Sequence, residues 1–225
     1  MIRWAYAFVD RPRPLLAAAG AFWAAVTGSR AEPFHEHLRL VRDDADPWIA
    51  VQGVHAGPGG AHVDLYVDDV AAVAARAEVV ADHGEWCVLR SPGGFLFCAV
   101  PWQGEHRRPA PGASLVDQVC LDVSPSRYEA EVDFWAALTG WELRAFPPEF
   151  HRLVRPPGLP IHLLLQRTDD EQPPSAHLDL ACADVAAERA RHESLGATFV
   201  AEFPEWTVMR DPAGGVYCLT DRQPA

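Results

Sequence analysis

The chain contains one long sequence pattern twice. Residues 22–28 (FWAAVTG) return as residues 134–140 (FWAALTG). Three further blocks recur in the same order, and they begin at Arg39 and Arg152, at Ala61 and Ala176, and at Glu85 and Glu205. Each copy spans roughly 110 residues, which is the size of an ordinary domain. The ordered repeats therefore predict a duplicated domain.

The two copies are separated by a polar stretch that is rich in residues typical of turns. Between Trp102 and Ser114 the chain carries Pro109, Pro111 and Gly112, and such residues interrupt helices and strands. We therefore expect an N-terminal domain over residues 1–103 and a C-terminal domain over residues 113–225.

Each half divides again into two segments with the same order of elements. A short alternating strand, such as residues 4–9, precedes an alanine-rich amphipathic helix, and further strands follow. Asp69 and Asp184 are typical N-cap residues, which predicts helices over residues 70–81 and 185–195. Strands at both ends of a lone helix favour an α+β fold in which antiparallel sheets carry helices on one face.

Side-chain alternation predicts which residues face away from the helices. The odd-numbered residues of the segment 62–67 are all aliphatic, so we expect them to pack on the helices. The opposite face then carries His62, Asp64 and Tyr66, and in the second copy His177 and Asp179. Where a sheet curls, this face becomes the wall of a cavity that suits a small molecule.

The repeated motifs resemble those of the vicinal oxygen chelate superfamily, which includes glyoxalase, bleomycin-resistance and extradiol dioxygenase proteins. The resemblance rests on the Phe-Trp-x-x-[Leu/Val]-Thr-Gly motif, on the Ala-His-[Leu/Val]-Asp-Leu strand before an Asp-capped helix, and on residues 210–219 (RDPAGGVYCL). It covers nearly the whole chain and implies tandem glyoxalase-like domains. Four βαβββ modules would form two cup-shaped, eight-stranded mixed sheets.

Metal-using members of this superfamily place His or Gln on the first strand of each module and Glu on the last. The matching positions are Trp4, Gln52, His62 and Cys98 in the first half, and Gln118, Gln166, His177 and Cys218 in the second. Gln and Cys thus replace both acidic ligands, and neutral amides bind divalent ions poorly. The sequence predicts no catalytic metal and no other cofactor. The alternative is a divalent metal in the second cup, held by His177, Cys218 and the two amides or by Asp179.

The first functional hypothesis is a metal-free module that binds a small, largely aromatic or apolar organic molecule, as resistance-type members do by sequestration. The expected lining of the first cup is Trp4, Tyr6, Trp48, Gln52, His62, Asp64, Tyr66 and Cys98. The expected lining of the second, more polar cup is Gln118, His162, Gln166, His177, Asp179, Cys218 and Thr220.

The second hypothesis is an enzyme of the lyase or isomerase type. In this enzyme His177 would act as a base, Asp179 would orient its imidazole, and Gln118 and Gln166 would polarise a substrate carbonyl. A His-x-Asp pair can also be purely structural, with its two polar groups satisfying each other beside a cavity. In a third alternative, one half is a degenerate structural partner, so that mutations in the first cup would leave ligand affinity unchanged.

Composition narrows the partners of the protein. The formal charge of −12 disfavours nucleic acid and anionic membranes, and the chain contains no Lys for a Schiff base. The five cysteines lack a C-x-x-C spacing and are expected to be reduced and buried. No secretory leader or long apolar run is evident, so we expect a cytoplasmic protein. We expect it to be a monomer or a weak homodimer.

Overall fold

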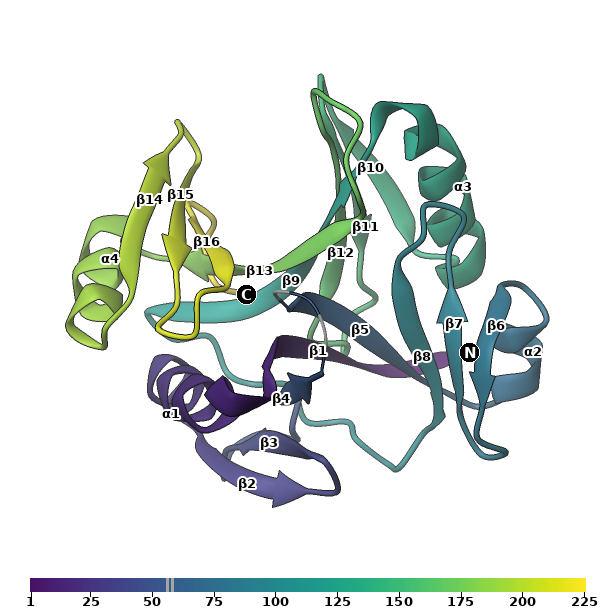
Figure 1. Cartoon of the computed structure of the whole chain (residues 1–225), viewed down its shortest axis with the longest axis horizontal. Coiled ribbons are helices and arrows are strands. Elements are labelled where there is room, and N and C mark those ends of the chain that lie inside the picture. Colours follow the sequence, from purple (N-terminus) through teal and green to yellow (C-terminus); the bar gives the residue numbers. More distant parts are fainter. Residues whose placement is uncertain (56, 58) are drawn as a thin grey trace.

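The computed structural model of the chain describes residues 1–55, 57 and 59–225, which form two eight-stranded sheets (Figure 1). The N-terminal half forms β1 (Ile2–Pro12), α1 (Leu16–Thr27), β2 (Arg30–Phe34), β3 (His37–Val41), β4 (Ile49–Val54), β5 (Gly60–Val67), α2 (Val70–Ala74), β6 (Glu78–Asp82), β7 (Cys87–Arg90) and β8 (Leu96–Pro101). The C-terminal half forms β9 (Ser114–Val123), α3 (Tyr128–Thr139), β10 (Glu142–Phe146), β11 (Phe150–Val154), β12 (His162–Arg167), β13 (Ser175–Cys182), α4 (Val185–Ser194), β14 (Thr198–Glu202), β15 (Trp206–Arg210) and β16 (Val216–Thr220).

Both sheets have the same strand order, which confirms the tandem βαβββ arrangement. The first sheet runs β2-β3-β4-β1-β5-β8-β7-β6, and the second repeats this order with β9 to β16. The first and last strands of a module pair in parallel, as in β1 with β4 and β5 with β8. The expectation of purely antiparallel pairing was therefore wrong, and the mixed sheets that the resemblance implied are confirmed. A parallel pair needs a long crossover, which the helix and the intervening strands supply.

The helix boundaries follow local sequence signals with one exception. The Asp69 and Asp184 side chains accept hydrogen bonds from the backbone N–H groups of the first helical turn of α2 and α4, each at 2.9 Å. However, α2 ends at Ala74, so the predicted helix over residues 70–81 was too long. The chain instead enters β6, where Val79 and Val80 have the β-branched side chains that favour strands.

The two sheets pack with their concave faces turned away from each other. Their central strands β1, β5, β9 and β13 lie together (Figure 1). Arg191 of α4 donates to the Val26 carbonyl of α1 at 3.0 Å, and Arg76, just after α2, donates to the Ala137 carbonyl of α3 at 2.5 Å. One buried apolar core includes residues of both halves. A buried ion pair also joins the halves, because Arg11 Nη2 lies 2.7 Å from Asp211 Oδ2. Among the described residues, no helix has the length and apolar composition needed to cross a membrane.

Candidate functional site in the second cup

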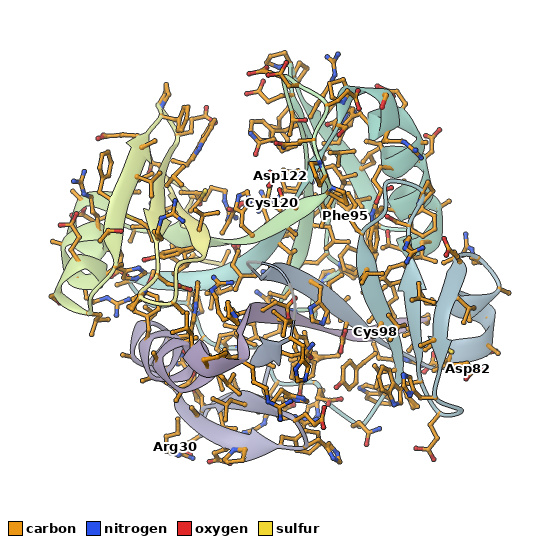
Figure 2. The ribbon with its side chains drawn as sticks, in the orientation of Figure 1. Arg30, Asp82, Phe95, Cys98, Cys120 and Asp122 are labelled. Atoms are coloured by element: carbon orange, nitrogen blue, oxygen red, sulfur yellow. The ribbon has the colours of Figure 1, made fainter. Side chains whose placement is uncertain are left out.

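A row of polar side chains crosses the concave face of the second sheet. Gln118, Cys120 and Asp122 alternate along β9, and His177 and Asp179 alternate along β13. The antiparallel register places Gln118 opposite Asp179 and Cys120 opposite His177. Figure 2 shows Cys120 and Asp122 on this sheet, away from Cys98 in the first sheet. Strand alternation and register together gather these five side chains.

A cavity of about 470 Å³ lies over this polar row. Its lining residues are Gln118, Cys120, Phe146, Phe150, Arg152, Leu164, Gln166, His177, Asp179, Glu205, Trp206, Cys218, Thr220, Asp221 and Arg222. The floor is polar, while Phe150 and Trp206 form an aromatic wall with ring centroids 5.7 Å apart. A larger groove of about 870 Å³ lies elsewhere, between the β7–β8 turn and the start of α3, and it contains none of the predicted site residues. Size and polarity make the second cup suitable for a small organic ligand.

His177 lies between two carboxylates. Its Nδ1 is 3.3 Å from Asp122 Oδ2, and its Nε2 is 3.4 Å from Asp179 Oδ1. Burial acts to lower the pKa of His177, but the interactions with Cys120, Asp122 and Asp179 outweigh it, so the pKa lies well above its ordinary value. In this arrangement the imidazole is a proton donor to carboxylates rather than a free base.

Two buried oxygen atoms beside His177 have no hydrogen-bond partner within the described part of the chain, Gln118 Oε1 and Asp179 Oδ1. The other ends of these groups are bonded to each other, because Gln118 Nε2 donates to Asp179 Oδ2 at 2.6 Å. Burial acts to raise the pKa of Asp179, but the His177 imidazole and other donors hold it below its usual range. The floor thus offers an ionised carboxylate whose Oδ1 forms no hydrogen bond among the described residues and faces His177 Nε2 at 3.4 Å. Leaving such buried acceptors unpaired is costly.

The donors on the floor fit a divalent metal ion. Ligand atoms of Cys120, His177 and Asp179 all lie within 4.8 Å of one another. A carboxylate on one imidazole nitrogen, with the other nitrogen facing a second ligand, is the usual arrangement around a metal-bound histidine. The unpartnered Gln118 and Asp179 oxygens also suit a cation. The expectation of no metal is therefore not supported, because Cys120 completes a donor set with His177 and Asp179 that the sequence positions alone did not include.

The first cup repeats the charged groups but places an aromatic ring against its histidine. His62 Nδ1 lies 2.6 Å from Asp10 Oδ2, and His62 Nε2 lies 3.5 Å from Asp64 Oδ1. The His62, Asp64 and Cys98 ligand atoms also cluster within 4.8 Å. The ring of Phe8 stacks on His62 at 4.6 Å, however. Phe8 lies opposite His62, as Cys120 lies opposite His177, so an aromatic ring occupies the place of a possible ligand.

The aromatic residues predicted to line the first cup are packed. The Tyr6 and Tyr66 rings are 4.8 Å apart, and both side chains are buried. The indole N–H of Trp4 donates to the Pro47 carbonyl, and that of Trp48 donates to the Val116 carbonyl in the other half. The two tryptophans are therefore core residues, because their polar atoms are already satisfied by backbone.

The sequence analysis wrongly matched Trp4 in the first half to Gln118 in the second. Tyr6 lies opposite Asp64 just as Gln118 lies opposite Asp179, so Tyr6, and not Trp4, occupies the position of Gln118. The offset of 112 residues between Phe22 and Phe134 would have set this register, because the same offset carries Tyr6 onto Gln118.

The remaining predicted residues are divided between the cavity and its surroundings. Gln166, Cys218 and Thr220 line the second cavity, and burial raises the pKa of the Cys218 thiol. His162 does not line it, and its Nδ1 accepts from the Arg155 N–H at 3.0 Å. Burial, followed by the charge of nearby arginines, lowers the pKa of His162 to about 2. In the first sheet, Gln52 lies opposite Asp10 on β4, and Cys98 lies opposite Asp64 on β8.

The residues around the two histidines and the second cavity that the sequence analysis missed are Asp10, Asp122, Cys120 and Arg152. Continuing the alternation from Gln118 along β9 would have found Cys120 and Asp122, since all three share one face. Asp10 precedes α1 as Asp122 precedes α3, which is a further repeat signal. Arg152 begins a repeated block, but nothing local indicates that it faces the cup.

Comparison with known proteins gives the family. The family model for a glyoxalase-like domain matches residues 7–100 and again residues 118–220. The chain belongs to the glyoxalase-like domain family. It is a tandem member of that family, and no curated protein matches it.

Solved structures with the same fold cover nearly all of this glyoxalase-like protein. The 2,2',3-trihydroxybiphenyl 1,2-dioxygenase from Sphingomonas wittichii is 15% identical, with a TM-score of 0.68 over 100% of this chain and 92% of its own. A Mn(II)-bound glyoxalase from Novosphingobium aromaticivorans is 18% identical, with a TM-score of 0.63 over 97% of this chain and 81% of its own. A mutant 4-hydroxymandelate synthase from Streptomyces coelicolor is 15% identical, with a TM-score of 0.60 over 100% and 93%. At this identity the similarity establishes the shared fold.

Proposed function

We propose that the second cup binds a small organic molecule over a divalent metal ion. The observation that carries this proposal is a pair of buried oxygens without a hydrogen bond among the described residues, Gln118 Oε1 and Asp179 Oδ1, on residues that line the 470 Å³ cavity. Asp179 Oδ1 faces His177 Nε2 at 3.4 Å, so an ion would bind between the carboxylate and the imidazole. Carboxylate oxygen and imidazole nitrogen are common ligands of divalent ions. A bound cation would remove the cost of leaving these buried oxygens unpaired.

Each residue of the floor has a role in this proposal. His177 and Asp179 would hold the ion, with Cys120 Sγ and Gln118 Oε1 as further donors. Asp122 would orient the His177 ring through Nδ1. A bound ion would supply Lewis-acid polarisation of a ligand oxygen. The aromatic wall would hold the apolar body of the ligand and exclude water from it.

The enzymatic form of the proposal is a metal-dependent lyase, isomerase or dioxygenase. Similar structures described as a Mn(II)-bound glyoxalase and as dioxygenases support this range of reactions. A metal-free enzyme with His177 as general base has less support, because both ring nitrogens already face carboxylates. Metal-free sequestration of a ligand remains the alternative if the floor takes up no ion.

The test is metal analysis of matched histidine variants. The wild-type protein is exposed to manganese, iron(II), nickel and zinc, desalted and analysed for bound metal, together with His177→Ala and His62→Ala. We expect about one equivalent per chain in the wild type and in His62→Ala, and none in His177→Ala. Circular dichroism and thermal melting confirm that both variants are folded, and Asp179→Asn serves as a second probe of the same floor.

Two results would contradict the metal proposal. The first is a wild-type protein that retains no metal after any of these exposures. The second is equal retention by the folded wild type, His177→Ala and Asp179→Asn, which would place the ion elsewhere.

A further inference from the structure

Arg152 is a cavity-lining cation without an internal partner. It lies on β11, and its Nε is buried without a hydrogen-bond partner in the part of the chain that the structure describes. Burial, followed by the charge of Arg222, lowers the pKa of Arg152 to about 10. The guanidinium therefore stays charged at neutral pH. The charges of Asp117 and Asp179 act on Arg152, but these carboxylates are paired with Arg222 and His177 respectively. A partly buried guanidinium without an ion pair of its own costs free energy that an incoming anion would recover.

The arginines near Arg152 already have partners. Arg222, which also lines the cavity, binds both oxygens of Asp117 at 2.7 and 2.9 Å and donates from Nε to Thr220 Oγ1 at 2.9 Å. Arg144, directly opposite Arg152 in the β10–β11 register, binds Glu142 at 2.7 and 3.1 Å. Of these three cations, Arg152 alone has its donors free for a ligand.

The first cup provides an internal comparison. Arg39 begins the same repeated block as Arg152, and it lies opposite Glu32 in the β2–β3 register, where the second half has Arg144. The Arg39 guanidinium also lies over the Phe34 ring, 3.3 Å from its centroid. The Nε of Arg39 is also buried without a hydrogen-bond partner among the described residues. Arg39 nevertheless faces an aromatic ring and lies opposite a glutamate, whereas Arg152 lies opposite another arginine.

We propose that Arg152 makes the second cup selective for small organic acids by binding their carboxylate, an inference that rests on the proposed small-molecule site. The planar guanidinium matches a carboxylate with two parallel hydrogen bonds. The apolar or aromatic body of the acid packs against Phe150 and Trp206. The unpartnered Gln118 Oε1 accepts a hydrogen bond from a hydroxyl group at the other end of such a molecule when no ion occupies the floor.

The experiment compares acids with their own amides, which have nearly the same shape but no charge. The pairs are benzoate and benzamide, 4-hydroxybenzoate and 4-hydroxybenzamide, and hexanoate and hexanamide. Binding is measured by calorimetry on full-length protein treated with EDTA, so that a bound metal cannot supply the preference. We expect the wild type to bind at least one acid about 10-fold or more tightly than its amide, as a charge-assisted pair predicts.

The variants separate charge from shape. Arg152→Gln should abolish the preference for the acid while leaving amide affinity within about 2-fold. Arg152→Lys keeps the charge without the planar fork, so its preference should fall between those of the wild type and Arg152→Gln. Arg39→Gln is the matched control and should keep the full preference. Thermal melting establishes that each variant is folded. If Arg152→Gln does not fold, the acid-over-amide preference of Arg152→Lys tests the role of Arg152.

Each outcome distinguishes this inference from the function on which it rests. Equal affinity for acid and amide in the wild type, or a full preference that survives in the folded Arg152 variants, overturns the role of Arg152 and leaves the cup as a binding site. Failure of the EDTA-treated wild type to bind any member of any pair overturns the role of Arg152, which needs no metal. The same titrations on metal-loaded wild type test the proposed function, and failure there as well counts against both proposals.

Discussion

At the scale of single residues, one side chain distinguishes the two cups. Phe8 and Cys120 occupy the same place on β1 and β9, opposite His62 and His177 respectively. The Phe8 ring stacks on His62, whereas the small Cys120 thiol leaves room for a cavity over His177. Similar His and Asp groups therefore have different surroundings in the two cups. This difference is why we propose ligand binding in the second cup.

The Asp122 carboxylate should tune metal binding without being a ligand. It lies 3.3 Å from His177 Nδ1, on the side of the ring away from Asp179. We expect Asp122→Asn to weaken metal affinity by about 10- to 100-fold, the usual effect of losing a carboxylate behind a metal-bound histidine. Competition with a metal indicator measures the affinity. The matched control, Asp10→Asn in the first cup, should leave the metal affinity unchanged. Unchanged affinity in Asp122→Asn would show that this carboxylate does not orient the ring.

At the scale of elements, the helices differ in how firmly their ends are fixed by local sequence. The repeated Thr-Gly motif ends α1 and α3, where Gly28 and Gly140 adopt the left-handed conformation with φ of 64° and 65°. Glycine adopts this backbone without strain. The α2 helix has no such stop, and its end was misplaced because the alanines that follow suit a helix while the competing strand depends on pairing with β7.

The α4 helix carries a histidine that should make stability depend on pH. His192 is fully buried, with Nδ1 2.8 Å from the Tyr217 hydroxyl and Nε2 near both Arg191 and Glu188. Burial, followed by the charge of Arg191, lowers its pKa to about 4, although Glu188 opposes this. The unfolded chain then binds a proton at higher pH than the folded one. Stability that is complete above pH 6.5 should be lost as the pH falls towards 4.

Comparison with His192→Gln isolates this effect. The free energy of unfolding is measured by denaturant titration between pH 7.5 and 4.5. The wild type should lose up to about 1.4 kcal/mol more per pH unit than the variant below pH 6.5, which corresponds to one proton. His37 and His162, whose pKa values are also lowered, are present in both proteins. Parallel profiles for the two proteins would contradict the prediction.

At the scale of the whole molecule, an asymmetric ion pair joins two similar domains. Arg11 at the end of β1 pairs with Asp211 in the β15–β16 turn, and the Trp23 indole N–H also donates to Asp211 Oδ2 at 3.1 Å. The other side of the interface uses a different contact, in which Glu131 accepts from the Gly93 N–H. The duplicated halves have therefore diverged where they meet.

Removing one partner of this pair should be strongly destabilising. Asp211→Ala would leave Arg11 buried without a counter-charge, which typically costs about 3 to 5 kcal/mol. Arg11→Met combined with Asp211→Ala removes both charges and should recover part of that loss. Denaturant unfolding of the two variants measures the difference. A single variant as stable as the wild type would show that this pair does not hold the halves together.

Repeats, helix caps and side-chain alternation are local properties, and they were enough to predict the duplication, the module order and the faces of the central strands. They also placed His177, Asp179 and Gln118 on the concave face. Three contacts became evident only in the folded chain: Asp122 and Cys120 lie against His177, Phe8 stacks on His62, and Arg152 lines the cavity from β11. These contacts depend on register, sheet curvature and pairing between distant segments, and no local periodicity specifies which side chains then meet.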